Sequence, residues 1–224
     1  MSIQSIQLRK LLCLFGASRA QRTRILRQDI RALINKDSGG AGDGGDFHVP
    51  FWSDAKRHAL DKADLHDETA LRVAKHGGRE RLYPQLRDGF LKWWTEKRRW
   101  RNDDFQPIEE PAHGQYVVGD IGTVRVEGPL AIQIGDGSHR IIYPYFSEEP
   151  ALSEEDARLG LWLISKALPG FSIDDLRILD VLRSRSVGVA DLPLKGDEAR
   201  RFEEKYQSII LEYTTLMGEY KRAA

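Results

Sequence analysis

The feature that constrains the fold most is a change in hydropathy period near Tyr116. Before that residue, apolar side chains recur every three or four positions, which is the spacing of amphipathic helices. After it, the segments 116–128, 129–136 and 139–146 alternate apolar and polar residues, and a Gly-Asp-Gly-Ser turn separates the last two. A helical N-terminal region followed by a strand-rich region predicts an α+β fold.

The second half of the chain also predicts the order of its elements. Ser153 and the acidic residues after it are typical of a helix start, and the apolar helix that follows ends at Pro169-Gly170. Residues 175–191 predict either a strand pair or one long bent strand, and a final helix begins at Asp197. With the alternating segments, this order predicts a mixed sheet flanked by helices.

The first part of the chain predicts helices and a break. An apolar face between Ile6 and Phe15 indicates a helix that Gly16 can end, and Ser18 can cap a second helix that runs to Lys36. Residues 37–46 contain five glycines, which is typical of a linker. The expected organisation is an N-terminal helical segment at 1–36, a Gly-rich linker at 37–46, and an α+β domain at 47–224, with helices in 47–102 and the sheet with its helices in 115–221.

Composition narrows the cellular setting. No apolar stretch approaches the roughly 20 residues that a membrane-spanning helix needs, and we interpret the apolar patch near the start as an amphipathic helix rather than a signal peptide. Cys13 is the only cysteine, and the histidines lack the spacing of a zinc site. These observations predict a cytoplasmic protein of bacterial type, with no membrane partner, no metal and no cofactor.

Charge is distributed unevenly along the chain. Residues 1–102 carry 21 Lys and Arg against 12 Asp and Glu, a balance of +9. Residues 103–224 carry 13 against 22, a balance of −9. The asymmetry predicts either a nucleic-acid surface in the basic half or two halves that dock against each other, and we favour docking.

The segment from Gln115 to Tyr220 is predicted to run strand, strand, strand, helix, strand, helix, and its second and third strands form the hairpin VEGPLAIQIGDGSHRIIYPYF. This order resembles the core of the restriction-endonuclease-like, PD-(D/E)XK superfamily. The resemblance covers about half of the chain and is strongest to the exonuclease-domain branch that acts in DNA repair. It implies a restriction-endonuclease-like fold. In that family an Asp on the first strand of the hairpin and an acid-x-Lys triplet on the next support Mg²⁺-dependent cleavage.

The positions that match those catalytic residues are altered in this chain. Pro129 stands at the place of the Asp, and Tyr143-Pro144-Tyr145 stands at the place of the triplet. None of these side chains is a metal-binding carboxylate. The resemblance therefore implies a degenerate active site with no catalytic residues. Asp120 and Glu127 are the carboxylates that a divergent Mg²⁺-dependent nuclease could use instead.

The segment LKWWTEKRRWR, residues 91–101, mixes cationic and aromatic side chains at the end of a predicted helix over Arg79–Trp100. Cations can neutralise phosphates, and exposed indoles can stack on unpaired bases. The simpler interpretation, which we favour, places Trp93 and Trp94 in the core and the cations in solvent. The best candidates for nucleic-acid contact are nevertheless in this segment: Lys92, Lys97, Arg98, Arg99, Trp100 and Arg101.

Together these patterns predict a non-catalytic protein that binds DNA, RNA or a protein partner through its basic helical half. A divergent nuclease, which would require Mg²⁺, is the first alternative. The second is a structural or interaction subunit, in which the basic and acidic halves contact each other or another copy in a homo-oligomer.

Overall fold

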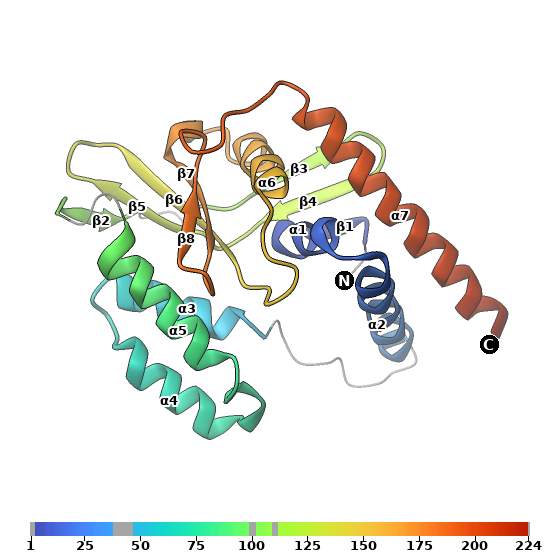
Figure 1. The fold of residues 1–224 in the computed structure, drawn as a ribbon, viewed down its shortest axis with the longest axis horizontal. Coiled ribbons are helices and arrows are strands. Elements are labelled where there is room, and N and C mark those ends of the chain that lie inside the picture. Colours follow the sequence, from blue (N-terminus) through green and yellow to red (C-terminus); the bar gives the residue numbers. More distant parts are fainter. Residues whose placement is uncertain (1–2, 38–46, 99–101, 109–111, 224) are drawn as a thin grey trace.

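The computed structural model describes residues 3–37, 47–98, 102–108 and 112–223, which form an α+β fold as the sequence predicts (Figure 1). The strands are β1 Ser5–Gln7, β2 Phe105–Pro107, β3 Gly114–Val118, β4 Gly122–Val126, β5 Leu130–Ile134, β6 His139–Tyr145, β7 Leu176–Asp180 and β8 Arg185–Val187. The helices are α1 Leu8–Gly16, α2 Arg19–Asp37, α3 Val49–Ala59, α4 Leu65–Lys75, α5 Tyr83–Lys92, α6 Glu154–Ala167 and α7 Glu198–Ala223. Three short turns complete the fold: η1 Gly77–Arg79, the π-helical η2 Trp93–Lys97 and η3 Ile173–Asp175.

The strands form two sheets. One has three strands in the order β1-β4-β3, and the other has five in the order β2-β5-β6-β7-β8. β5 and β6 make the predicted antiparallel hairpin, whereas β6 and β7 are parallel. A parallel pair needs a crossover connection, and α6 supplies it. The five-stranded sheet is therefore mixed, as expected.

The segment 175–191 contains a strand pair, β7 and β8, which is one of the two alternatives that the sequence predicts. Two other details of the strands differ from the prediction. The segment 116–128 is not one strand but the hairpin β3–β4, because the backbone turns at Gly119, where φ is 47°. Ile6, which we placed on the first helix, lies in β1, and β1 pairs in parallel with β4. Strand pairing over such a distance in sequence leaves no local hydropathy signal.

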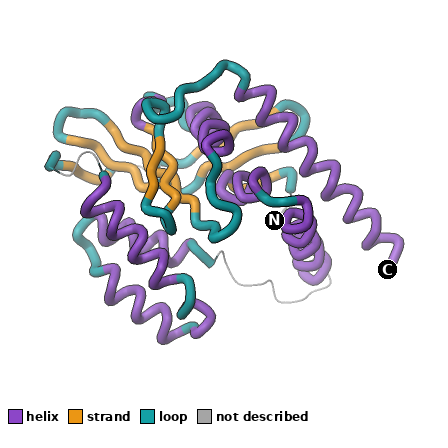
Figure 2. Tube along the Cα trace, in the orientation of Figure 1, coloured by secondary structure: helices purple, strands orange, loops and turns teal. Residues whose placement is uncertain are grey.

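Two apolar cores lie on opposite sides of the five-stranded sheet. The major core joins α1, α6 and α7 to β3, β4 and one face of β6, while the minor core joins α3, α5 and η2 to the other face. Figure 2 shows helices on both sides of the strands. Leu8, Leu11 and Leu12 of α1 are fully buried in the major core, and the Tyr206 hydroxyl of α7 donates a hydrogen bond to the Ile3 carbonyl at 2.7 Å. The N-terminal helices thus pack against the sheet in one body.

The helix predicted over Arg79–Trp100 is shorter than expected. α5 starts at Tyr83, with a proline in its first turn, and ends at Lys92. It continues as η2, where the Arg98 amide donates to the Trp93 carbonyl at 3.0 Å, five residues back. Trp93 and Trp94 are buried, at 2% and 7% exposure, which confirms the interpretation that they are core residues. Only glycine fits at residue 89, since a Cβ there would lie 2.1 Å from the Val181 carbonyl oxygen.

Ion pairs join the basic half of the chain to the acidic half. Arg22 contacts Glu212 at 2.6 Å and Arg27 contacts Glu219 at 3.3 Å, which joins α2 to α7. Arg81 contacts Glu148 at 2.5 Å. Docking of the basic half on the acidic half is therefore confirmed at these pairs.

The structure covers the predictions about a membrane span and about the linker only within its described residues. In the part of the chain that is described, no helix is both long and apolar enough to cross a membrane. The predicted linker lies outside the described residues from position 38 to position 46.

Candidate anion-binding site

The positions that match the nuclease triplet are filled by packed side chains. Tyr143 and Tyr145 are each 1% exposed and face the major core. The Tyr143 hydroxyl accepts a hydrogen bond from the Arg9 amide at 3.1 Å, and the Tyr145 hydroxyl donates one to the Pro150 carbonyl at 2.7 Å. Burial raises the pKa of Tyr145 far above its usual range, which keeps this phenol neutral. Residues 143 and 145 therefore serve packing.

The carboxylates of the nuclease alternative lie apart. Asp120 is exposed in the β3–β4 turn, and Glu127 follows the other end of β4. A strand rises about 3.3 Å per residue, which places them roughly 20 Å apart. Glu127 accepts hydrogen bonds from Gln7 at 2.8 Å and from Arg125 at 2.9 Å. The described residues contain no group of three or more His, Cys, Asp or Glu side chains that could hold a metal ion.

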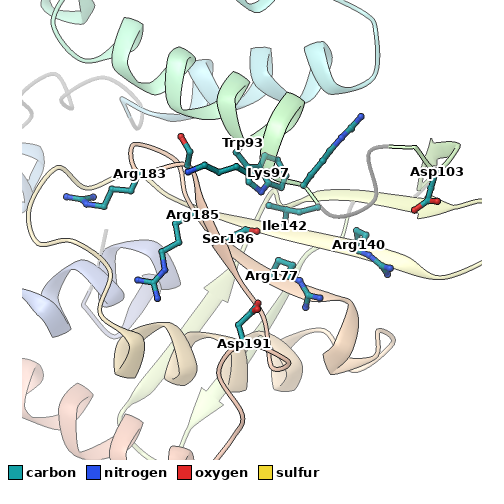
Figure 3. A pocket seen from close by; sticks show the side chains of 12 residues that line it. Trp93, Lys97, Asp103, Arg140, Ile142, Arg177, Arg183, Arg185, Ser186 and Asp191 are labelled. Carbon is teal, nitrogen blue, oxygen red and sulfur yellow. The ribbon is translucent and has the colours of Figure 1, made fainter.

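Cationic side chains instead gather on the opposite face of β6, around a cavity of about 550 Å³ (Figure 3). The turn η2 lies on one side of this cavity, and β6, β7 and β8 lie on the other. We call it the basic cavity. The cations among the described residues that line it are Lys97, Arg98, Arg140, Arg177, Arg183 and Arg185, and the acids are Asp103 and Asp191.

Arg140 and Arg177 project from neighbouring strands. Because Ile142 pairs with Arg177 in register, Arg140, two residues earlier on β6, is a diagonal neighbour of Arg177 on the same face of the sheet. Figure 3 shows both side chains pointing the same way. Nη1 of Arg140 makes three contacts: with Ser138 Oγ at 3.2 Å, the His139 carbonyl at 2.6 Å and Asp175 Oδ1 at 3.2 Å. Its Nε and Nη2 have no partner among the described residues.

Arg177 is held against the protein backbone. Its Nη1 donates to the carbonyl of Asp174 at 3.0 Å and to the carbonyl of Leu176 at 2.9 Å. The guanidinium lies over Gly188, where a Cβ would be only 1.9 Å from Nη1. A glycine at residue 188 is therefore what lets the Arg177 guanidinium occupy this place beside the cavity.

Arg183 and Arg185 differ from that pair. Both point to the other side of β8 in Figure 3. Nη1 of Arg183 donates to both carboxylate oxygens of Asp180, at 3.2 and 3.1 Å, and burial raises the pKa of Asp180. Arg185 contacts Glu154 at 3.3 Å, in a pair that is half or more exposed on both sides. Exposed pairs of this kind contribute about 0–1 kcal/mol, so Arg185 can exchange partners easily, whereas Arg183 is a structural residue.

The turn η2 and the residue directly after it supply the remaining two cations. Lys97 is exposed, and Arg98 is half-buried with its guanidinium carbon 3.8 Å from the centre of the Trp94 ring. This cation–π contact fixes the position of Arg98 at the cavity. The structure thus brings two of the predicted nucleic-acid-binding residues, Lys97 and Arg98, into one site. Lys92 is exposed on α5 outside the cavity lining, and positions 99–101 lie outside the described residues.

Carboxylates balance part of this positive charge. Besides the two acids that line the cavity, Asp175, Asp180 and Glu154 pair with Arg140, Arg183 and Arg185 respectively. The local excess of cations is therefore small. Anion binding at this site would depend on the positions of the guanidinium groups as much as on net charge. Guanidinium groups held in fixed positions suit the planar, bidentate recognition of phosphate.

Arg140 and Arg177 were not identified as candidate binding residues from the sequence, although their positions in the strands are unusual for arginine. Arg140 and Arg177 occupy strand positions whose neighbours on the same face are apolar and buried, such as Ile142 and Leu179. A charged residue at such a position is unusual, and two of them on paired strands mark the place where the apolar face ends. Finding that pairing required the register between β6 and β7.

Comparison with known proteins adds no assignment. No protein-family model matches the chain, and no curated protein matches it. The function is therefore argued from the basic cavity and the fold around it.

Proposed function

We propose that this protein binds nucleic acid without cleaving it, through the basic cavity and the adjoining end of α5 and η2. The observation that carries the proposal is the convergence of cations from β6, β7 and the end of η2 on one cavity. Phosphate contacts by Lys and Arg supply most of the affinity of such proteins, because bound counterions are released.

We further propose that the fold is a degenerate restriction-endonuclease-like core. The antiparallel β5–β6 hairpin, the crossover through α6 and the parallel β7 match part of the element order on which that resemblance rests, and this part supports the proposal. Pro129, Tyr143 and Tyr145 at the catalytic positions support a binding role rather than Mg²⁺-dependent hydrolysis.

A titration of labelled DNA or RNA by fluorescence anisotropy, at several salt concentrations, tests the proposal. Affinity should fall steeply with salt, and replacement of Lys97, Arg98 or Arg177 with Ala should flatten the slope by up to about one unit per lost phosphate contact. Lys75→Ala is the matched control, because Lys75 is exposed on α4, outside the cavity lining. Equal, weak binding by all variants would contradict the proposal.

The same titration extends to the part of the predicted basic segment that the structure does not describe. Joint replacement of Arg98, Arg99 and Arg101 with Ala should weaken binding across sequences. Trp100→Ala should weaken single strands more than duplexes, since stacking on an aromatic ring contributes about 1–3 kcal/mol per base. If the joint variant loses no more affinity than Arg98→Ala alone, and Trp100→Ala loses none, the binding surface is confined to the cavity.

An interaction subunit is the second candidate. The ion pairs Arg22–Glu212 and Arg27–Glu219 join basic residues of α2 to acidic residues of α7 within this chain, and they support this candidate because similar pairs could form with another protein. If the titration finds no nucleic-acid affinity, an acidic protein surface becomes the preferred ligand of the basic cavity.

A further inference from the structure

We infer that the basic cavity receives an unpaired nucleotide of a single strand and disfavours duplex DNA. This inference rests on the proposed nucleic-acid function and specifies its substrate class. Two observations support it: the depth at which the strand arginines lie and the arrangement of their donors.

The cavity is walled rather than flat. Its floor is the sheet at β6 and β7, where Ile142 is fully buried between Arg140 and the minor core, and its opposite side is the turn η2 (Figure 3). A volume of about 550 Å³ is in the range of small-ligand pockets, which span roughly 300–1,000 Å³.

A duplex and a single strand meet such a cavity differently. A duplex is a stiff rod with its phosphates on a convex surface, and proteins usually read it by inserting a protruding helix or ribbon into a groove. Here the arginines of the floor do not protrude, because Arg140 donates to the His139 carbonyl at 2.6 Å and Arg177 donates to the Leu176 carbonyl at 2.9 Å, which holds both guanidinium groups close to the sheet. An unpaired strand is narrow and flexible enough to place its backbone inside.

The donors on the floor are arranged for phosphate. Arg140 uses only Nη1 in its described contacts, so its Nε and Nη2 can form a bidentate pair with a phosphate. Arg177 lies diagonally across on the same face and is positioned by Gly188. Long side chains at diagonal positions of a sheet can reach a common partner.

Binding in this cavity is expected to be independent of base sequence. Among the described residues that line it, the aromatic one is Trp93, which is only 2% exposed and offers little area for stacking. Recognition therefore depends on the phosphates, and it should depend strongly on salt.

The test compares one labelled strand with the same strand annealed to its complement, using the full-length protein. The single strand should bind several-fold more tightly than the duplex. Arg140→Gln and Arg177→Gln should remove that preference, while Lys75→Ala should preserve it. Gly188→Ala serves as a second variant of different kind, because it displaces the Arg177 guanidinium without deleting it, and it should also remove the preference. A circular-dichroism melt of each variant verifies folding.

The outcomes separate the two proposals. Absence of binding to single strands and duplexes of both DNA and RNA would reject the nucleic-acid function itself. Equal or tighter binding of the duplex, or a preference that survives Arg140→Gln, Arg177→Gln and Gly188→Ala, would overturn the single-strand inference while leaving the broader function in place. ATP is a further probe, since a free nucleotide offers the same chemistry. Tight ATP binding without affinity for the strand would overturn the inference in favour of a free nucleotide.

Discussion

The two faces of β6 have opposite characters although they belong to one strand. Ile141, Tyr143 and Tyr145 point into the major core and are buried, whereas Arg140 and Ile142 lie on the face that meets the basic cavity. Successive residues of a strand alternate between faces, so the two sets are interleaved along the chain. Stability can therefore depend on one set of alternate residues of β6 and binding on the other, so that a substitution in one set can leave the other property unchanged.

The polar atoms on the two faces are satisfied in different ways. Each tyrosine hydroxyl has a backbone partner, supplied by Arg9 for Tyr143 and by Pro150 for Tyr145. On the other face, Arg140 is anchored through one nitrogen only. The first arrangement leaves nothing for a ligand to bind, and the second leaves donors for one.

The largest expected effect comes from placing a charge on the core face. Tyr145→Lys would bury an unpaired ammonium group, and it should lower the free energy of unfolding by about 4 kcal/mol or more. Tyr145→Phe, the control, removes one hydrogen bond and should cost about 1 kcal/mol. Urea denaturation measures both. Wild-type stability in Tyr145→Lys would show that this face can hold a charge, which would erase the contrast with the cavity face.

Alkaline pH should lower the stability of the major core, through Tyr206 of α7. Burial raises the pKa of Tyr206 to about 12, compared with about 10 for an exposed tyrosine. Between these values the unfolded chain has lost this proton and the folded chain retains it, so unfolding releases a proton and stability falls as pH rises. Below about pH 10 the contribution is fully present. Urea denaturation from about pH 9 to about pH 12 should show a shallower decline in Tyr206→Phe, and identical curves would count against this assignment.

A charge placed on the cavity face should affect binding but not folding. Ser186 lines the basic cavity and is partly exposed. Ser186→Asp should weaken nucleic-acid binding by adding a like charge beside the phosphate, while stability should stay within about 0.5 kcal/mol. Ser186→Asn is the control without charge. Undiminished affinity in Ser186→Asp would place the binding surface elsewhere.

The smallest expected effect is on nucleic-acid cleavage. With Mg²⁺ or Mn²⁺ added, the protein should leave DNA and RNA intact on a gel, because the acid-x-Lys positions hold buried tyrosines. Metal-dependent cutting that disappears in Asp120→Ala or Glu127→Ala would restore the nuclease alternative.

Local signals predicted those elements whose cause is local. Ser153 accepts the amide of Asp156 at 3.0 Å at the start of α6, and α7 begins at Glu198, directly after Asp197. The β5–β6 hairpin formed where its turn residues indicated. The strand β1 was missed because its partner β4 lies more than a hundred residues away, and no propensity records such a pairing.

Only the part of the candidate site at the end of η2 was predictable from the sequence. Lys97 and Arg98 stood out because cations and aromatic residues cluster in sequence there. Arg140 and Arg177 did not stand out, because they lie in separate strands and come together only through the β6–β7 register. A site built from several segments is visible in a sequence only where one of those segments concentrates the chemistry.

The closure of the major core by both ends of the chain has a consequence for the order of folding. The Ile3 carbonyl is bonded to Tyr206 of α7, and β1 completes a sheet with β4. During synthesis, the first strand emerges from the ribosome long before these partners exist. The apolar surface of α1 therefore stays partly exposed until β4, α6 and finally α7 have been synthesised. Contacts so distant in sequence slow folding and lengthen the time during which apolar surface is exposed to aggregation.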